Sequence, residues 1–187
     1  PVLSIVDPEL MKTVPPQYTA YQGFDALFHN TEVMISNGVN IISETIALSA
    51  IERIAKYLPL AVKNGEDLEA REHVAYGSTI AGIAMQLTST TAQHAMEHAM
   101  SAYHPNLPHG AGLIMISKAF SEFFIEKHAC DGQFIKMARA LTSHGILYTS
   151  FKYGTAEGER NGRYFTDMTE EKMDKLLKDV NLFDILE

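Results

Sequence analysis

Four side chains of types that bind divalent metal ions lie in two short segments of the chain. Asp25 and His29 stand four residues apart in TAYQGFDALFHNTE, so on a helix both project from one face and could bind the same ion. His94 and His98 repeat this spacing in QHAMEHAM. His109 follows a proline in HPNLPHGAG, where a loop could bring it back to the helix that carries His94. One carboxylate and several imidazoles favour Fe(II) or Zn(II) over Ca or Mg.

The neighbours of Asp25 also point to a bound ion. Phe24, Leu27 and Phe28 are strongly apolar, whereas an ionised Asp is rarely buried unless it is paired. A cation would resolve this conflict, and so would an Arg or Lys partner from elsewhere in the chain.

A rival zinc pattern overlaps the second segment. The residues from His94 to His98 read H-x-x-E-H, in which two histidines bind zinc and the Glu activates water in inverted zinc peptidases. A pattern this short arises easily by chance in a chain with 8 histidines, and it would leave Asp25 and His29 without a role. We therefore expect Glu97 to be a charge on the surface of its helix.

Other reactive side chains show no comparable pattern. The single cysteine, Cys130, has no base beside it in the sequence, so we expect it to be structural or on the surface. There is no G-x-S-x-G, no P-loop and no G-x-G-x-x-G after a strand. The remaining isolated histidines are expected to be packed or surface side chains: His73, His128 and His144.

Length and composition fit one domain, or at most two small ones. With 187 residues, of which 46% are apolar, the chain can build one sizeable core. A single cysteine and the lack of a long apolar run predict a soluble, cytoplasmic protein. The net charge of −8 disfavours nucleic acid or an anionic membrane as a partner, since both bind clustered Lys and Arg.

Apolar residues recur at helical spacing through most of the chain. Thr19 is the expected N-cap of the first helix, and Asp67 is the expected N-cap of the third. Six helices are predicted over about 20–36, 40–62, 68–87, 90–103, 111–127 and 132–143. A last helix is expected after Thr169, with the chain end docked on the core, and no element is expected between Gly145 and Thr166.

The first residues predict a different kind of element. Val2, Leu3, Ile5 and Val6 form an apolar run closed by Asp7-Pro8, which indicates one buried strand. A lone strand leaves its backbone groups unpaired, and the chain starts without an initiator Met, so we expect the rest of the sheet in a preceding domain that this sequence lacks. Residues 1–8 are then the end of that absent domain, and residues 9–187 form the helical domain.

Several segments together resemble the C-terminal domain of the iron-containing (group III) alcohol dehydrogenases. They are DPELMKTVPPQYTAYQGFDALFHNTE, AIERIAKYLPLAVKNGEDLEARE, AGIAMQLTSTTAQHAMEHAMSAYHPNLPHGAGL and FIKMARAL, which span roughly residues 5–142. The most specific parts are D-x-x-x-H at Asp25, H-x-x-x-H at His94 and P-H-G at Pro108. The resemblance implies an all-α, multihelical domain of the dehydroquinate synthase-like/iron alcohol dehydrogenase type, preceded in the family by an α/β nucleotide-binding domain.

The same resemblance implies a role for each matching residue. His98 matches an additional histidine that lies near the nicotinamide and is not a ligand, and Met85 matches a position that lines the substrate pocket. The implied reaction is reversible hydride transfer between an alcohol and NAD(P), which gives an aldehyde or ketone. In it, His98 could pass the alcohol proton to solvent or orient the nicotinamide. The family's four ligands for iron, or zinc in some relatives, are matched by Asp25, His29, His94 and His109.

The chain departs from the family pattern at several positions. One extra residue between His98 and His109 makes His104 an alternative ligand. Residues 89–91 stand where relatives often carry glycines, so contacts to substrate or nicotinamide are expected to differ. Beyond residue 145 the resemblance fades, and the pocket residue that the family carries there cannot be assigned.

Two alternative functions stay open at the level of the sequence. One is a zinc enzyme on the same scaffold, such as a glycerol dehydrogenase or a dehydroquinate synthase-like lyase. The other, from a different class, is a non-catalytic helical metal-binding module. Expected partners are a small alcohol or aldehyde, the missing nucleotide-binding domain and, in the full-length protein, further copies of the chain. The sequence leaves three choices open: which alcohol is the substrate, whether the cofactor is NAD or NADP, and whether the metal is iron or zinc.

Overall fold

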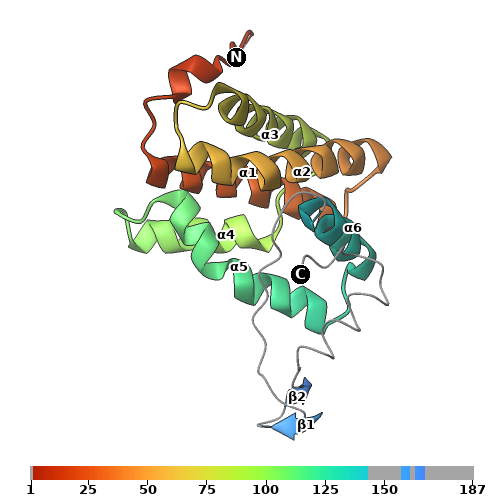
Figure 1. The fold of residues 1–187 in the computed structure, drawn as a ribbon. Helices are drawn as coiled ribbons and strands as arrows, with labels where there is room; N and C mark the ends of the chain where they lie inside the picture. The colour runs from red at the N-terminus through yellow and green to blue at the C-terminus, as the bar shows by residue number, and fades with distance from the viewer. Residues whose placement is uncertain (1, 143–156, 161–162, 167–187) are drawn as a thin grey trace, which may run out of the picture. The chain divides into compact units, whose positions relative to one another are not determined.

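The computed structural model describes residues 2–142, 157–160 and 163–166. These residues belong to two compact units, which divide between Gly145 and Ile146. The first unit contains every helix of the described residues, and the second contains two short strands (Figure 1). The predicted multihelical domain is confirmed by the first unit.

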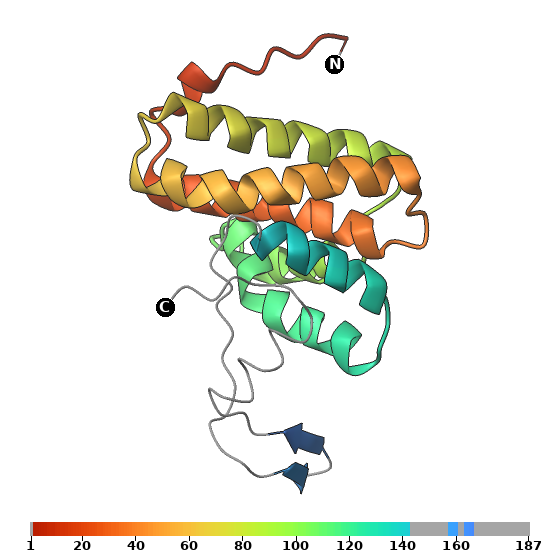
Figure 2. The same cartoon turned by 45° about the vertical axis from the view of Figure 1, so that its right-hand side comes forward.

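Three long helices form a bundle in the first half of the chain. They are α1 (Pro16–Ile35), α2 (Ile41–Lys63) and α3 (Leu68–Leu87), and they lie side by side in both views of the fold (Figure 1 and Figure 2). A single turn of 3₁₀ helix, η1 (Pro8–Met11), precedes them. The bounds agree within a few residues with those that the apolar spacing predicts, because a repeat near 3.6 residues places the apolar side chains on one face.

The starts of α2 and α3 follow from local hydrogen bonding. The Asn40 side chain accepts from the N–H groups of Ile42 and Ser43, and the Ser43 hydroxyl accepts from the N–H of Asn40, which makes a capping box. The Asp67 side chain accepts from the N–H of Ala70 at 3.0 Å, so the predicted cap of the third helix is confirmed.

The prediction that Thr19 caps the first helix is wrong. Helix α1 begins earlier, at Pro16, because a proline in the first turn lacks only an N–H that would have no helical partner. Thr19 is buried instead, and its hydroxyl accepts a 2.7 Å hydrogen bond from the Arg71 guanidinium. Arg71 also donates to the carbonyls of Val14 and Gly65. One buried side chain of α3 thereby ties the start of α1 to the turn before α3.

Three shorter helices complete the first unit. They are α4 (Ala92–Tyr103), α5 (His109–Glu126) and α6 (Asp131–Thr142). Helix α4 packs against α5, α5 contacts α1, and α6 contacts α2. The turn between α4 and α5 returns the chain so that the rings of His94 and His109 are 5.5 Å apart, as the proline before His109 predicted.

The apolar core lies between α1 and α2 and under the later helices. Val33, Met34 and Ile51 are fully buried in it, and Phe120 of α5 and Met137 of α6 cover them. Apolar surface removed from water in this way stabilises the fold by about 25 cal/mol per Å².

The predicted buried strand at the start of the chain is not formed. Residues 2–7 have no regular secondary structure, and Val2, Leu3 and Ile5 are each 77% exposed or more. An extended segment becomes a strand only when a neighbour pairs with its backbone groups, and the described residues supply none beside this segment.

The second unit also corrects the sequence-based expectation, which placed no element between Gly145 and Thr166. Strand β1 (Glu157–Arg160) pairs antiparallel with β2 (Arg163–Thr166), and Arg160 is opposite Arg163 at the closed end. Strands of four residues are too short to show a clear two-residue alternation, so the pattern did not reveal them. The helix expected after Thr169 lies outside the described residues.

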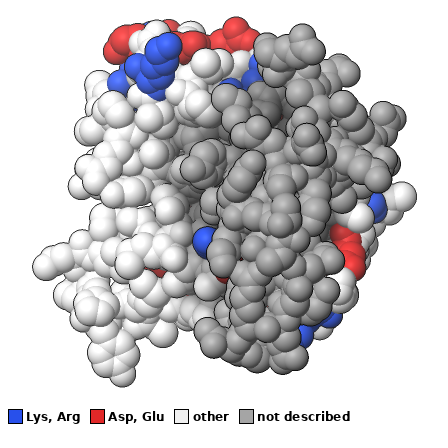
Figure 3. All heavy atoms as spheres, turned by 60° about the horizontal axis from the view of Figure 1, so that its bottom comes forward, with Lys and Arg blue, Asp and Glu red and all other residues white. Residues whose placement is uncertain are grey.

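The surface carries charge unevenly. On the face displayed in Figure 3, Lys and Arg atoms are few among the described residues and form no continuous stripe.

Within the described part of the chain, every helix is too short or too polar to cross a bilayer.

Candidate metal centre

Asp25 and His29 of α1 meet side chains from α4 and α5 at one point. The Oδ1 atom of Asp25 lies 3.3 Å from Nε2 of His29, 3.2 Å from Nε2 of His94 and 3.5 Å from Nε2 of His109. Asp25, His29 and His94 each place one candidate ligand atom within 4.8 Å of the others. Three helices therefore direct three imidazole nitrogens towards one carboxylate oxygen, and His109 joins the group through its distance to Asp25 alone.

The hydrogen bond between His94 and Glu32 shows why this place suits a cation. Its Nδ1 donates to the buried carboxylate of Glu32, so a neutral His94 ring turns the lone pair of Nε2 towards Asp25. Two electron-rich atoms repel unless a positive charge lies between them. Ligand atoms about 2.1 Å from a tetrahedrally coordinated zinc ion lie about 3.4 Å from each other. The distances of 3.2 to 3.5 Å around Asp25 Oδ1 fit such an ion.

Glu32 is a functional residue that the sequence did not suggest. It is fully buried, and its Oε1 accepts from the N–H and hydroxyl of Thr91 at 2.7 and 2.6 Å and from the N–H of Gln93 at 3.1 Å. Its Oε2 accepts from Nδ1 of His94. Glu32 of α1 thus caps the start of α4 and holds the ring of His94. The available signal was its position seven residues after Asp25, on the same face of the helix.

The prediction that Glu97 is a surface charge is wrong. Glu97 is fully buried, its Oε2 accepts from Nδ1 of His109, and its Oε1 accepts from the Ser101 hydroxyl at 2.5 Å. Helix α5 covers it at Gly112, where an added Cβ would lie 2.8 Å from Glu97 Oε1. Because the carboxylate is engaged behind His109, the arrangement gives no support to the water-activating role that H-x-x-E-H assigns to it.

The carboxylates and imidazoles shift each other's acidity. Burial alone would raise the pKa of Asp25, but the hydrogen bond with His94 and the charges of His29 and His109 outweigh burial and lower it. Burial would also raise the pKa of Glu32, but hydrogen bonds from His94 and Thr91 outweigh burial and lower it. Burial would lower the pKa of His94, yet its bonds to Asp25 and Glu32 raise this pKa to about 9. The two carboxylates thus favour a positive charge at His94.

His29 behaves in the opposite way. Burial, followed by the nearby charge of His94, lowers its pKa below the usual value. Its ring stacks on that of His94 with centroids 3.9 Å apart. A neutral imidazole is the form that binds a metal ion, so His29 is ready to act as a ligand at neutral pH.

His98 lies one helical turn from His94 and is exposed. Its ring centroid is 6.4 Å from that of His94 and 5.5 Å from that of His109, so it borders Asp25 Oδ1 and the three imidazole nitrogens around it without being one of them. Glu97, His98 and His109 form a second group whose candidate ligand atoms lie within 4.8 Å of each other. His104 is exposed and belongs to neither group within the described residues.

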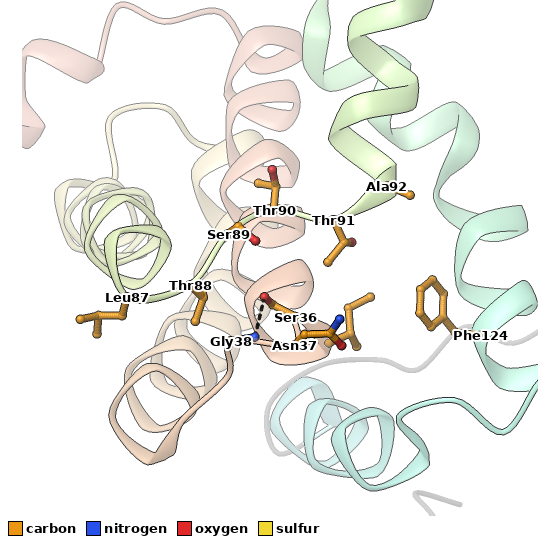
Figure 4. Close-up of a pocket in the computed structure, with 11 residues that line it drawn as sticks. Ser36, Asn37, Gly38, Leu87, Thr88, Ser89, Thr90, Thr91, Ala92 and Phe124 are labelled. Carbon is orange, nitrogen blue, oxygen red and sulfur yellow. Dashed lines mark hydrogen bonds between the residues drawn. The ribbon is translucent and has the colours of Figure 1, made fainter.

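A cavity of about 610 Å³ lies beside the segment that joins α3 to α4. Figure 4 shows residues 88–91 on one side, the turn with Ser36 and Gly38 on another, and Phe124 of α5 opposite. Thr91 lines this cavity and also donates to Glu32, which is itself not among the residues that line the cavity. The substrate-pocket residue expected from sequence, Met85, is half-buried against the apolar core.

Known proteins show the same domain. The family model described as the Fe-containing alcohol dehydrogenase family, C-terminal, matches residues 19–181. Alcohol dehydrogenase 4 of Schizosaccharomyces pombe is 42% identical over 110 residues, which are 59% of this chain and 26% of that protein. NAD-dependent methanol dehydrogenase of Bacillus methanolicus is 35% identical over 127 residues, or 63% of this chain and 33% of that protein. The chain spans about a third or less of the length of these two relatives.

Solved structures agree with this assignment. An alcohol dehydrogenase from an archaeal halo-thermophile of a Red Sea brine pool superposes with a TM-score of 0.74 at 30% identity, covering 100% of this chain and 44% of that one. A 1,3-propanediol oxidoreductase superposes with a TM-score of 0.67 at 33% identity, covering 72% of this chain and 35% of that one. The chain belongs to the Fe-containing alcohol dehydrogenase family and corresponds to its C-terminal domain.

Proposed function

We propose that this chain is the metal-binding catalytic part of an NAD(P)-dependent alcohol dehydrogenase, which transfers hydride reversibly between an alcohol and an aldehyde or ketone. The observation that supports this proposal most is the single oxygen of Asp25 that faces Nε2 of His29, His94 and His109. Relatives named for alcohols, among them the methanol dehydrogenase and the 1,3-propanediol dehydrogenase of Citrobacter freundii, point to the same reaction class.

The proposed assembly has two parts. Residues 9–187 are the helical catalytic domain, and residues 1–8 are the end of a nucleotide-binding domain that lies outside this sequence. Two facts support this division: the chain covers 26% of alcohol dehydrogenase 4, and the apolar side chains of residues 2–6 are exposed here. In the whole enzyme that domain would bind NAD or NADP and would cover this apolar segment.

In the proposed mechanism, Asp25, His29, His94 and His109 hold Fe(II), with zinc as the alternative. When bound, the divalent ion supplies Lewis-acid polarisation of the alcohol oxygen. His94 is 3% exposed and His109 is 37% exposed, so the cluster is more accessible at His109 than at His94. A small alcohol can therefore approach from the side of His109.

His98 is the proposed proton carrier. It is exposed, stands beside His94 and His109, and carries an imidazole, a side chain that can take up and release a proton. It can accept the alcohol proton and release it to solvent, or it can orient the nicotinamide. Met85 is proposed to line the pocket for the carbon chain of the substrate.

The test is carried out on the full-length protein purified without oxygen. Metal content is quantified first, and the protein is then assayed with a panel of aldehydes and with NADH and NADPH. The proposal expects about one Fe or Zn per chain and aldehyde reduction that a chelator abolishes. Metal binding without reductase activity would instead support the non-catalytic metal-binding module.

A matched pair of variants makes this test specific. Asp25→Asn keeps the size of the side chain but removes the negative charge, so metal content and activity should fall together. Glu122→Gln makes the same chemical change at a side chain of α5 that is 56% exposed, and it should leave both unchanged. Equal activity in both variants would contradict the proposal.

A further inference from the structure

Two buried carboxylates stand behind the imidazole cluster, one for each of two histidines. Nδ1 of His94 donates to Glu32, and Nδ1 of His109 donates to Glu97. Both glutamates are fully buried. The third histidine differs, because Nδ1 of His29 is buried and has no partner among the described residues.

Burying a carboxylate costs several kcal/mol unless its charge is compensated, and a packed apolar residue would often stabilise the same position better. Glu32 has a structural reason for its place, since it also caps the start of α4. Glu97 has no structural reason of this kind for its buried position. Among the described residues, it accepts besides from His109 only from Ser101, one turn away on the same helix. Its burial is therefore best explained by what it does to His109.

A carboxylate at Nδ1 has a defined effect on an imidazole. It fixes the proton on Nδ1, leaves the lone pair on Nε2 and makes Nε2 a stronger ligand for a metal ion. It also fixes the plane of the ring. His109 needs this support because it is the first residue of α5, follows a turn and is 37% exposed, so packing alone holds it weakly.

We propose that Glu97 is a positioning residue that fixes the Nδ1–H tautomer and the orientation of His109, so that Nε2 faces the ion held by Asp25. Glu32 plays the same part for His94. This inference rests on the proposed metal site. It assigns no contact with the substrate to either glutamate, and it predicts that the metal is held less tightly when Glu97 loses its charge.

The experiment uses the full chain and Zn(II), a diamagnetic probe of the site. The dissociation constant is measured by competition with a chromophoric chelator for the wild type, Glu97→Gln and Glu97→Ala. Loss of a partner of this kind weakens metal binding by about 10- to 100-fold, and Gln should lose less than Ala because its oxygen can still accept from Nδ1. Glu122→Gln on exposed α5 is the control and should bind Zn(II) like the wild type.

A second readout separates positioning from general destabilisation. Long-range ¹H–¹⁵N NMR spectra of the Zn(II)-loaded chain report which ring nitrogen of His109 carries the proton. The wild type should show the Nδ1–H form, and Glu97→Ala should show a weakened or exchanging signal while the amide spectrum of the α1–α3 bundle is unchanged. Should Glu97→Ala fail to fold, the nearly isosteric Glu97→Gln carries both measurements.

The outcomes distinguish this inference from the proposed function. Wild-type Zn(II) affinity in Glu97→Gln and in any folded Glu97→Ala would overturn the positioning role and leave the metal site intact. Failure of the wild-type chain to bind any divalent ion would overturn the proposed function, and the positioning role with it. Weaker binding together with an altered His109 tautomer would support the inference.

Discussion

Helix α1 presents two chemically different faces to the rest of the first unit. On one face, Ala26 and Val33 are buried against apolar side chains that include those of α2. On the other face, Asp25, His29 and Glu32 meet polar groups of α4 and α5. Burial of apolar surface stabilises the first face by a force that involves no cation. The second brings two carboxylates and several imidazoles together, and its stability depends on which cation lies between them.

The apolar face of α1 stabilises the fold, whereas the polar face carries the candidate metal site. The α1–α3 bundle should be stable without metal, since its core is apolar and its helix ends are capped by its own residues. The docking of α4 and α5 on α1 should instead respond to the metal.

Removal of a ligand should abolish metal retention without unfolding the bundle. His29→Ala and His109→Ala should each lose the ion during gel filtration, because each substitution removes one of the four proposed ligands and leaves an incomplete site. His98→Ala is the matched control on α4, since the His98 ring supplies none of the proposed ligand atoms. This variant should keep the ion, while turnover in the full-length enzyme slows. Metal analysis after gel filtration measures all three, and equal metal loss would contradict the assignment of ligands.

A cavity in the apolar bundle should have the reverse effect. Ile54 is fully buried against Gly77, where an added Cβ would lie 2.4 Å from Ile54 Cγ1. Ile54→Ala should lower the free energy of unfolding by about 2–5 kcal/mol, as measured by urea denaturation, and leave metal stoichiometry unchanged. Ile42→Ala, at a side chain of α2 that is 62% exposed, should cost far less. Loss of metal in Ile54→Ala would show that the two faces are coupled.

Chelation of the metal should destabilise one side of the molecule. A ligand present at 100 times its dissociation constant stabilises the native state by about 2.7 kcal/mol, so a chelator should remove an amount of this order. Hydrogen exchange should accelerate in α4 and at the start of α5 and stay unchanged in the centres of α2 and α3. Uniform acceleration across all these helices would contradict the separation of the two faces.

The smallest effect should come from a helix cap far from the metal. Asn40→Ala removes the acceptor for two N–H groups at the start of α2, which should cost about 1 kcal/mol of unfolding free energy. Exposed Asn37 in the preceding turn caps nothing in α2, so Asn37→Ala serves as the control. Thermal unfolding of the metal-loaded and metal-free forms should show the same cost in both. A different cost in the two forms would show that the metal acts through α2.

Sequence patterns predicted the helices well because each buries one stripe of apolar side chains. They failed where a property depends on contacts between distant segments. Glu97 looked like a surface charge because its burial under Gly112 is set by how α5 packs on α4. The importance of Glu32 was hidden because its partners, Thr91 and His94, lie 59 and 62 residues away.

The prediction for the N-terminal segment also depends on a contact between distant segments. An apolar run such as residues 2–6 predicts a strand only if a neighbouring strand exists, and a single sequence does not say whether it does. By contrast, Asp25 and His29 were identifiable because both lie on one helix face, where spacing alone places them together.

The most direct measurement is a crystal structure of the metal-loaded protein with anomalous diffraction recorded at the absorption edge of the bound metal. We expect one strong anomalous peak about 2.0–2.2 Å from Asp25 Oδ1 and from Nε2 of His29, His94 and His109. A peak bound instead by Glu97 and His98, or no peak near Asp25, would contradict the assignment of this site.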